Sequence, residues 1–286
     1  MELIKKQIHM NQWKGNVTTQ ITLDDDFIVP DTLDDMEQVM LDTGEIQIET
    51  VKNQGDKVAV KGKLEFQVLY RKESGGLQTL GGNIPFEEVV NVQGLEEKDY
   101  VGLNWMLEDL NTDMINSRKL GVQAIITLQV RVETLRDVEA AVDVDMENSS
   151  RPAGAGMSDT DGAGQVQVET LKRTANAAAI AVRRKDTYRI KEELSLTGGK
   201  PNIGQLLWRE MKLRDVTAKP LDGRLHLDGE LSVFVIYGAE DENMPVQWLE
   251  ETIPFSGDME MGDVKEDQIP MVTVRLAHKD MEAKPD

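Results

Sequence analysis

Cysteine is absent from this chain of 286 residues, and aromatic residues make up only 5% of it. The absence of cysteine excludes disulfides, thiolate nucleophiles and cysteine-ligated metal sites. Long hydrophobic runs are also missing, and the residues that follow Lys5 and Lys6 do not form the apolar core of a signal peptide. These absences predict a cytoplasmic protein with no segment inserted in a membrane.

Acidic residues outnumber basic ones, which gives the chain a formal net charge of −20. Such a charge repels the phosphates of nucleic acids and anionic lipids, so we expect no nucleic-acid partner. The same charge keeps a protein soluble, which by itself explains the excess of acidic residues. Hydrophobic residues make up 40% of the chain, which is enough for two folded domains with mainly aliphatic cores.

One strand-like stretch occurs twice in the chain. The sequence VAVKGKLEFQVLY at 58–70 returns as RLHLDGELSVFVIY at 224–237, with an offset of 167 residues between matching positions. Apolar and polar residues alternate in both copies, which predicts a strand with one buried face. Both copies carry a glycine at the same place, Gly62 and Gly229, and this predicts a bulge or a close approach of the backbone.

The repeat reaches well beyond this strand. Residues 21–23 match 188–190 at the same offset, and the IPF at 84–86 matches the IPF at 253–255 at an offset of 169. A long internal repeat indicates related domains in tandem. The predicted organisation is a first domain at 1–146, a flexible linker rich in Gly, Ala, Ser and Asp at 147–165, and a second domain at 166–286.

Strand patterns joined by turn residues dominate both halves of the chain. The predicted fold is all-β, with two tandem antiparallel domains of the β-sandwich or barrel-like type. Each domain is expected to hold one short helix, because apolar residues at 32–42 and at 202–210 follow the i, i+3, i+4 spacing of a helix face. The alanine-rich stretch 171–182 has helix propensity, but its repeat partner at the start of the chain favours a strand.

The second copy of the repeat is the shorter one. The first copy ends with the strand pattern SRKLGVQAIITLQVRVETLRD at 117–137, and the second copy has no counterpart. The second domain is therefore expected to lack its last strand. Three interpretations stay open: the chain is a fragment, the domain does without this strand, or another chain supplies the strand by edge addition.

Catalytic chemistry finds no support in the sequence. The motifs GxSxG, HExxH and GxxxxGK[ST] do not occur, so nothing favours a nucleophile elbow, a zincin site or a P-loop. The histidines His9, His226 and His278 are far apart in strand-like sequence, and we interpret them as ordinary strand residues. We predict no catalytic residue, no bound cofactor and no enzymatic activity.

Two acidic clusters carry the oxygen ligands that a calcium ion prefers. They are Asp24, Asp25 and Asp26 in one cluster, and Asp143, Asp145 and Glu147 in the other. Strand alternation separates the neighbours in the first cluster, and the second lacks the glycine and the terminal glutamate of an EF-hand loop. Solvated acidic surface is the favoured interpretation of both, so we predict no metal site.

The tryptophans are either core residues or anchors for a partner. A core position is favoured for Trp105, which matches Leu276 in the repeat, and for Trp208, which lies in an apolar stretch. The other two, Trp13 and Trp248, stay open as interface residues.

Several motifs that follow one another in order carry a family resemblance. They are LDDDFIVPD at 23–31, KVAVKGKLEFQVLY at 57–70, IPFEE at 84–88, KDTYRIKEE at 185–193 and PLDGRLHLDGEL at 220–231. Together they resemble the SPOCS-domain family of clostridial sporulation proteins. The chain is similar to the N-terminal part of SipL, the spore-coat morphogenetic member of that family.

This resemblance implies a non-enzymatic structural or adaptor role in spore-coat assembly through protein–protein contacts. The implied partners are other spore-coat proteins or further copies of the chain, in the mother cell and on the spore surface. Self-assembly into a filament or layer is a variant, in which each subunit completes its neighbour's short second domain. The alternative interpretation is a soluble carbohydrate-binding or calcium-stabilised β-sandwich module, which is an analogy from fold alone.

Overall fold

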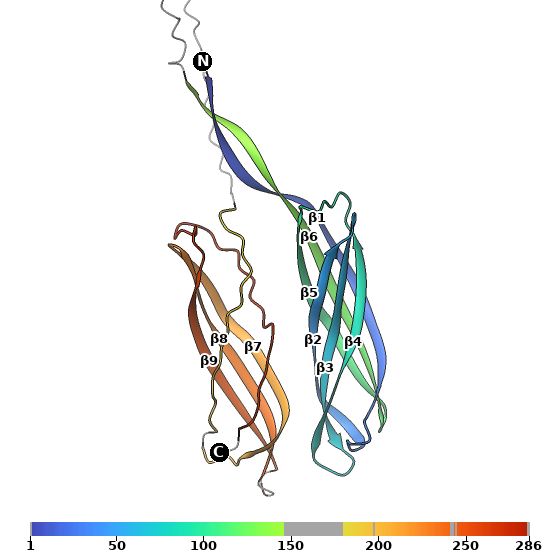
Figure 1. The fold of residues 1–286 in the computed structure, drawn as a ribbon. Helices are drawn as coiled ribbons and strands as arrows, with labels where there is room; N and C mark the ends of the chain where they lie inside the picture. The colour runs from blue at the N-terminus through green and yellow to red at the C-terminus, as the bar shows by residue number, and fades with distance from the viewer. Residues whose placement is uncertain (1, 146–179, 197, 241–242, 244, 285–286) are drawn as a thin grey trace, which may run out of the picture.

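The computed structural model describes residues 2–145, 180–196, 198–240, 243 and 245–284 (Figure 1). The strands are β1 (Glu2–Ile28), β2 (Met36–Asn53), β3 (Lys57–Lys72), β4 (Leu77–Asn91), β5 (Tyr100–Asn116), β6 (Lys119–Asp145), β7 (Ile203–Leu221), β8 (Arg224–Ala239) and β9 (Val246–Glu260). All ladders between them are antiparallel. The described residues contain no helix that could span a membrane.

The first six strands form two three-stranded sheets with the strand orders β2-β3-β4 and β1-β6-β5. We call this unit the first sandwich, because one large hydrophobic core lies between the two sheets. The strand β6 supplies seven of its buried residues, at every second position from Leu120 to Val132. This alternation arises because successive side chains of a strand point to opposite faces of the sheet.

The last three strands form a single sheet with the order β7-β8-β9. They are the counterparts of β2, β3 and β4 in the sequence repeat, and their inner face carries a smaller core. Residues 180–196 and 269–284 have no assigned strand. They nevertheless pack on this core through Ile190, Leu196, Leu276 and Met281. We call residues 180–284 the second copy, and Figure 1 shows it beside the first sandwich.

The predicted helices at 32–42 and 202–210 are wrong, because most of each stretch lies in a strand, β2 or β7. The register of β2 slips between Met36 and Gln38 and again between Val39 and Leu41. Each slip is a β-bulge that adds one residue, so the core-facing residues Met36 and Val39 are three positions apart rather than two. The strand β7 slips at the counterpart positions. A strand with such bulges therefore shows the same spacing of apolar residues as a helix face.

The glycine shared by both copies marks a close approach of neighbouring atoms. A Cβ atom at Gly62 would lie 2.6 Å from the carbonyl oxygen of Gln47 and 2.8 Å from the ring of Phe86. At Gly229 a Cβ atom would lie 2.6 Å from the ring of Phe255. Each ring belongs to the cross-strand partner of its glycine. The ring fills the space that a side chain would need, so the predicted close approach is confirmed.

The tyrosine near the end of each repeated strand has the same role in both copies. Tyr70 and Tyr237 are fully buried, and burial raises the pKa of both phenols. The Tyr70 hydroxyl donates a 3.0 Å hydrogen bond to the carbonyl oxygen of Asp34, and Tyr237 donates one of 3.2 Å to Pro201. Each tyrosine thus links the loop before β2 or β7 to the middle strand of its sheet by a hydrogen bond.

The predicted all-β class is confirmed. None of the three sheets formed by the described strands closes into a barrel, so the sandwich alternative applies to the first copy. The predicted domain boundaries stay a prediction. The predicted linker at 147–165 and most of the predicted strand at 171–182 lie outside the described residues.

Candidate strand-binding site

Among the described residues, the second copy has no counterpart of β6, the central strand of its sheet in the first sandwich. There, β1 and β5 each lie next to β6, which separates them in the sheet. Their counterparts are residues 180–196 and 269–284, which form no ladder among the residues that the structure describes. Loss of a central strand removes the hydrogen-bonding partner of both its neighbours, which explains why neither segment is a strand. We call the position between the two segments the slot.

One position in each segment corresponds to a residue that pairs with β6 in the first sandwich. In the first sandwich Leu23 and Leu110 pair with the same residue of β6, Ala124. Their counterparts in the second copy are Ile190 and Met281, and both pack on its core. The two segments therefore pack over the inner face of the sheet, where Leu227, Leu231 and Val233 of β8 are buried.

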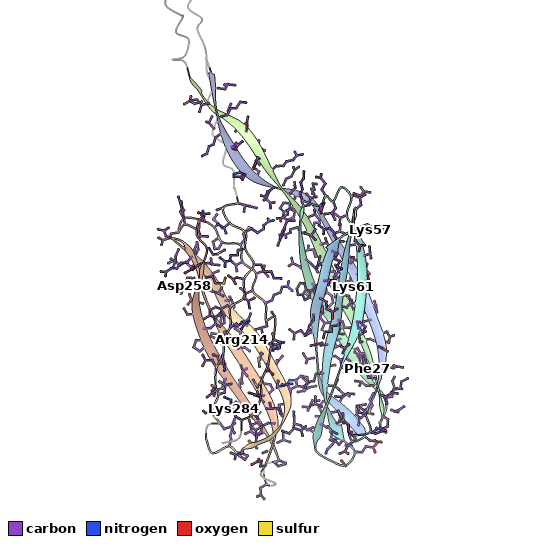
Figure 2. All side chains as sticks on the ribbon, viewed as in Figure 1. Phe27, Lys57, Lys61, Arg214, Asp258 and Lys284 are labelled. Atoms are coloured by element: carbon purple, nitrogen blue, oxygen red, sulfur yellow. The ribbon has the colours of Figure 1, made fainter. Side chains whose placement is uncertain are left out.

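An ion pair spans the slot near its lower end. The Glu193 carboxylate accepts a hydrogen bond from Lys284 Nζ, which lowers the pKa of Glu193 and raises that of Lys284. In the first sandwich the counterparts Asp26 and Asp113 both pair with Gly121 of β6. Neighbouring strands lie about 4.8 Å apart, so two long side chains are needed to bridge two spacings. Figure 2 labels Lys284 at this end of the second copy.

A cavity of about 480 Å³ is present in the second copy. It lies between β7 and the residues Val272 and Val274 of the second segment. Their counterparts in the first sandwich are Val101 and Leu103, which pair with two fully buried valines of β6. The cavity therefore corresponds to the contact between β2 and β5 in the first sandwich.

Basic side chains line the solvent face of the slot. Lys185, Arg189 and Lys191 are exposed, and strand alternation puts them on the face opposite to the one through which Ile190 packs on the core. This basic row stands out in a chain whose net charge is −20. The segment 180–196 thus has an apolar inner face and an outer face on which Lys185, Arg189 and Lys191 are basic.

The strands β1 and β6 continue past the first sandwich as a two-stranded ribbon, which Figure 1 shows leaving one end of the molecule. The last residue of β6 that pairs with β5 is Glu133, so residues 134–145 pair with the start of β1 alone. Large apolar side chains are exposed along the ribbon: Leu3, Ile4, Met10, Leu135, Val138 and Val142. An isolated two-stranded ribbon is marginally stable in water, so this element is suited to binding a partner.

The β6 half of the ribbon, residues 134–145, alternates acidic and aliphatic residues. We call these residues the β6 tail. Its acidic residues include Asp137, Glu139 and Asp143. Within the ribbon, Glu139 Oε2 accepts a 3.1 Å hydrogen bond from Lys5 Nζ, and Asp137 contacts His9. The tail therefore already lies against a basic strand.

At the base of the ribbon, the buried acid Asp99 forms an ion pair with Lys14. Lys14 Nζ donates hydrogen bonds of 2.8 Å to Asp99 and 3.0 Å to Glu96. Burial by itself raises the pKa of Asp99, but the hydrogen bonds from Lys14 and from the Glu96 amide bring it below its usual value. The hydrogen bond to Asp99 also raises the pKa of Lys14. In the second copy the counterparts of Lys14 and Asp99 are Ala181 and Gln268, which carry no charge.

The three histidines lie on different elements and do not form a common site. His9 is on the ribbon, His226 is on β8, and His278 is exposed on the segment 269–284. His226 Nδ1 lies 2.6 Å from Asp258 Oδ1, and its Nε2 lies 3.1 Å from Asp228 Oδ2. These contacts, chiefly the hydrogen bond with Asp258, raise the pKa of His226. The arrangement is an ion-pair cluster on a strand surface.

Two acidic clusters were considered above as calcium ligands, and in the first of them the carboxylates contact other side chains. Gln123 donates a hydrogen bond to Asp24, and Lys119 pairs with Asp26 at 2.6 Å. Asp143 lies in the β6 tail, and the side chains of its two cluster partners lie outside the described residues. Within the described part of the chain, no three His, Cys, Asp or Glu residues group closely enough to hold a metal ion. The carbohydrate-binding or calcium-stabilised alternative stays a prediction.

Two of the tryptophans are packed and two are exposed. Trp208 is buried against β3, so it joins the two copies instead of filling one core. Trp105 packs on the first core, with the guanidinium of Arg275 4.0 Å from its ring centre. Trp13 and Trp248 are each more than half exposed, and each has a basic side chain over its ring. Interface roles for these two stay a prediction.

A family profile described as "SipL, SPOCS domain" matches residues 35–115 and 202–284, which together make up more than half of the chain. The chain belongs to the SPOCS-domain family. Membership indicates a role related to sporulation. No curated protein and no solved structure matches the chain.

The two SPOCS matches cover the same structural part of each copy. The first runs from the start of β2 to the end of β5, and the second covers the counterpart residues from β7 to the end of the segment 269–284. The strand β6 lies outside the matched residues. The strand that the second copy lacks is therefore not part of the matched SPOCS region in the first copy either.

Sequence reasoning missed the charged residues of the slot and of the β6 tail. Lys185, Arg189 and Lys191 lie at odd-numbered positions of one stretch, and Glu139 and Asp143 at odd-numbered positions of the other. The sequence signal for these residues was charge of one sign at every second position, which places the charges on one face of a strand. It becomes informative only when the topology shows that β6 is the central strand.

Proposed function

We propose that this SPOCS protein is a non-enzymatic structural or adaptor protein of spore-coat assembly, which acts through protein–protein contacts. It works in the mother cell and is assembled on the spore surface. The observation that carries the proposal is the pair of segments 180–196 and 269–284, because extended segments that form no ladder among the described residues are suited to pairing with another polypeptide. Family membership supplies the link to sporulation.

The partners in this proposal are other spore-coat proteins or further copies of the chain. In the self-assembled form, each subunit completes the second copy of the next one, and a filament or layer results. Nucleic acids and membranes are not partners, because a net charge of −20 disfavours contact with phosphates and anionic lipids.

Removal of the gene from its sporulating host tests this role. We expect spores with a displaced or incomplete coat in thin-section electron microscopy, and a fluorescent fusion of the chain at the forespore surface. Restoring the gene should restore the coat. A normal coat, together with a fusion spread through the mother cell, would contradict the proposal.

Electron microscopy and light scattering of the purified chain test the self-assembled form. We expect fibres or sheets, and a mass that grows with protein concentration. A monodisperse monomer at high concentration with a folded second copy would rule out self-assembly and leave the adaptor role in place.

A further inference from the structure

We propose that the sheet β1-β6-β5 binds an uncharged glycan chain on the face that is turned away from the first core. We call this face the outer face. The inference goes beyond the proposed function, because it assigns the chain a carbohydrate ligand in addition to its protein partners. It depends on two exposed aromatic rings, on the neutral side chains that follow them along the strands, and on a cavity at the base of the ribbon.

Two aromatic side chains lie in one row across the outer face. Trp13 of β1 and Tyr100 of β5 both pair with the same residue of β6, Glu133. Val132, the residue before Glu133, points into the core, so the three paired side chains lie on the outer face. We call Trp13, Glu133 and Tyr100 the aromatic row. Neighbouring strands lie about 4.8 Å apart, so the backbone positions of the two aromatic residues are about 10 Å apart, which a glycan of a few sugar rings can span.

Both rings of the aromatic row are supported by arginine and remain accessible. The guanidinium of Arg131 lies 4.5 Å from the centre of the Trp13 ring. The guanidinium of Arg183 lies 4.0 Å from the centre of the Tyr100 ring. One guanidinium covers only one face of a ring, and Trp13 is 56% and Tyr100 50% exposed. Each ring therefore keeps free surface for a ligand.

The middle residue of the aromatic row fixes its surroundings. Glu133 is buried, and its carboxylate accepts hydrogen bonds of 2.8 Å from Asn11 Nδ2 and 2.5 Å from Arg183 Nη2. The second bond holds the guanidinium that packs against Tyr100. Side chains that are already held in place lose little conformational freedom when a ligand binds. The aromatic row is thus organised before it meets a ligand.

Neutral side chains with hydrogen-bonding groups follow the aromatic row along all three strands. They alternate with core residues, so they share the outer face with Trp13 and Tyr100. On β1 and β5 they are exposed, and on β6 they are half-buried. Amide and hydroxyl groups both donate and accept hydrogen bonds. The members are Asn16, Thr18 and Gln20 on β1, Thr127 and Gln129 on β6, and Asn104 on β5.

The corresponding face of the other sheet in the first sandwich is charged. On the solvent face of β3, Lys61 pairs with Glu87 at 2.8 Å, and Lys63 pairs with Glu65 at 2.5 Å. Figure 2 labels Lys61 on this face. Solvation alone therefore gives this protein a face of charged pairs. The neutral rows of the outer face match a ligand that has many hydroxyl groups and no charge.

A cavity of about 470 Å³ adjoins the aromatic row at the base of the ribbon. Arg183 lines the cavity and also contacts Glu133 and Tyr100. Leu135 lines it too, and is the next residue of β6 on the outer face. Ligand sites combine apolar surface with a few polar groups in a concave place, and this cavity does so. Its lining is His9, Leu135, Asp137, Ile180, Ala181 and Arg183.

The chemistry of the outer face selects a neutral glycan over other ligands. A sugar ring has C–H groups on its faces, which pack on aromatic rings, and hydroxyl groups on its edge, which bond to amides, hydroxyls and guanidiniums. An anionic polymer is disfavoured by the net charge of −20. A stable protein interface has an apolar centre, whereas most of the outer face carries amide and hydroxyl groups.

Calorimetric titration of the full chain tests the inference. The probes are the β-linked hexamers of glucose and of N-acetylglucosamine, and we expect the chain to bind at least one of them. Trp13→Ala and Tyr100→Ala should each weaken binding by about tenfold or more, because each removes a stacking ring. The two substitutions together should abolish binding. Trp13→Phe should keep most of the affinity, since it keeps an aromatic ring.

Trp248 on β9 provides a matched control for the aromatic row. It is 55% exposed, and Lys200 Nζ lies 4.7 Å from the centre of its ring, so it resembles Trp13 in both respects. It belongs to a different sheet, and Trp248→Ala should bind glycan like the wild type. Circular dichroism of each variant shows that it is folded.

The neutral rows are tested by a smaller change. Gln129→Ala should weaken binding by about threefold, because it removes an amide that bonds to the ligand. Gln67→Ala is the control, since Gln67 is a half-buried glutamine on the solvent face of β3. Binding should be the same in low and high salt, because salt screens only interactions between charges.

Three results would overturn the inference. One is a wild-type chain that binds neither hexamer at millimolar concentration. Another is an equal loss of binding in Trp248→Ala and Trp13→Ala. The third comes from light scattering without glycan: if the double substitution Trp13→Ala and Tyr100→Ala lowers the mass of the wild-type chain, the outer face is a contact between molecules of this protein. Each result leaves the proposed role in the coat standing, because that role does not require a glycan.

Discussion

The first sandwich and the second copy share one sequence pattern and differ by one strand. Close to the middle strand they are alike, since Leu64 and its counterpart Leu231 are both buried. On the strand that lies against β5 they differ, because Ile46 of β2 is buried and its counterpart Leu213 of β7 is only half-buried. The core of the second copy is therefore looser beneath β7, while its three-stranded sheet is intact.

The comparison also teaches what makes a segment a strand. The counterparts of β1 and β5 keep their place against the core in the second copy, yet they form no ladder among the described residues. Strand preference reflects packing and pairing with neighbours more than an intrinsic property of the residues. The central strand therefore determines the state of both segments beside it.

The largest expected difference between the two copies comes from a substitution in β6 that creates a cavity in the first core. Ile126 is fully buried in the first core, so Ile126→Ala should cost about 4 kcal/mol of stability there. The second copy has no counterpart of this residue, so hydrogen exchange in β7–β9 should stay as it is. Ile125→Ala is the matched control, because Ile125 lies on the opposite face of the same strand. Equal losses from the two substitutions would refute the assigned core of β6.

A smaller effect is expected at the shared glycine. Gly62→Ala should cost about 2 kcal/mol, because the new methyl group would overlap the Phe86 ring and a carbonyl oxygen. Gly229→Ala should cost less, since the less filled second core lets the Phe255 ring move. Gly102→Ala is the control, where the nearest atom lies at an ordinary 3.6 Å. Denaturation followed by hydrogen exchange separates the two copies, and a larger loss at Gly229 would contradict the looser packing.

The contribution of the base of the ribbon to stability should depend on pH in the first sandwich, whereas the counterpart position in the second copy should make no such contribution. Lys14→Met leaves the buried Asp99 carboxylate without its cation and should destabilise the first sandwich, whereas Ala181→Met at the counterpart position should not. The pKa of Asp99 is lowered in the folded state, so its contribution is present above the unfolded pKa and is lost as pH falls through the folded pKa. Urea titrations of both variants at neutral and acidic pH check this, and a Lys14→Met loss that persists in acid would contradict it.

The smallest expected effect belongs to the second copy. The pKa of His226 is raised in the folded state, so the contribution of His226 is present below its unfolded pKa and is lost as pH rises through the folded pKa. His226→Gln should therefore destabilise β7–β9 in mild acid and have little effect in alkaline solution. Asp258→Asn should remove the same pH dependence, since Asp258 is the main partner. A loss that does not depend on pH would assign His226 a packing role instead.

Much of the fold could be predicted from alternation and repetition. The repeated strand, the glycine that touches an aromatic ring and the short second copy are all visible in the sequence, because each depends on residues close together or on a direct match. The false helices arose because bulges near Met36 and Val39 shift the apolar spacing from two to three. Where a strand bulges depends on its neighbour, which a local pattern does not contain.

The candidate site was predictable only as a missing strand. The basic row at Lys185, Arg189 and Lys191 and the acids of the β6 tail are ordinary surface charges until the ladders are known. That β6 lies between β1 and β5 follows from its ladder with β1, in which the partners Ile28 and Lys119 are 91 positions apart and Glu2 and Asp145 are 143 apart. No spacing rule within one strand contains this information.

The strand β2 slips in register at three places, and β7 slips at the corresponding three, the last between Ile48 and Thr50 and between Arg214 and Thr217. Each bulge bends its strand and increases the local twist, so β2 and β7 are curved at corresponding positions. A sheet packed against one copy therefore already has the shape that the other requires. The sheets β2-β3-β4 and β7-β8-β9 thus present inner faces of the same curvature to the segments that pack on them.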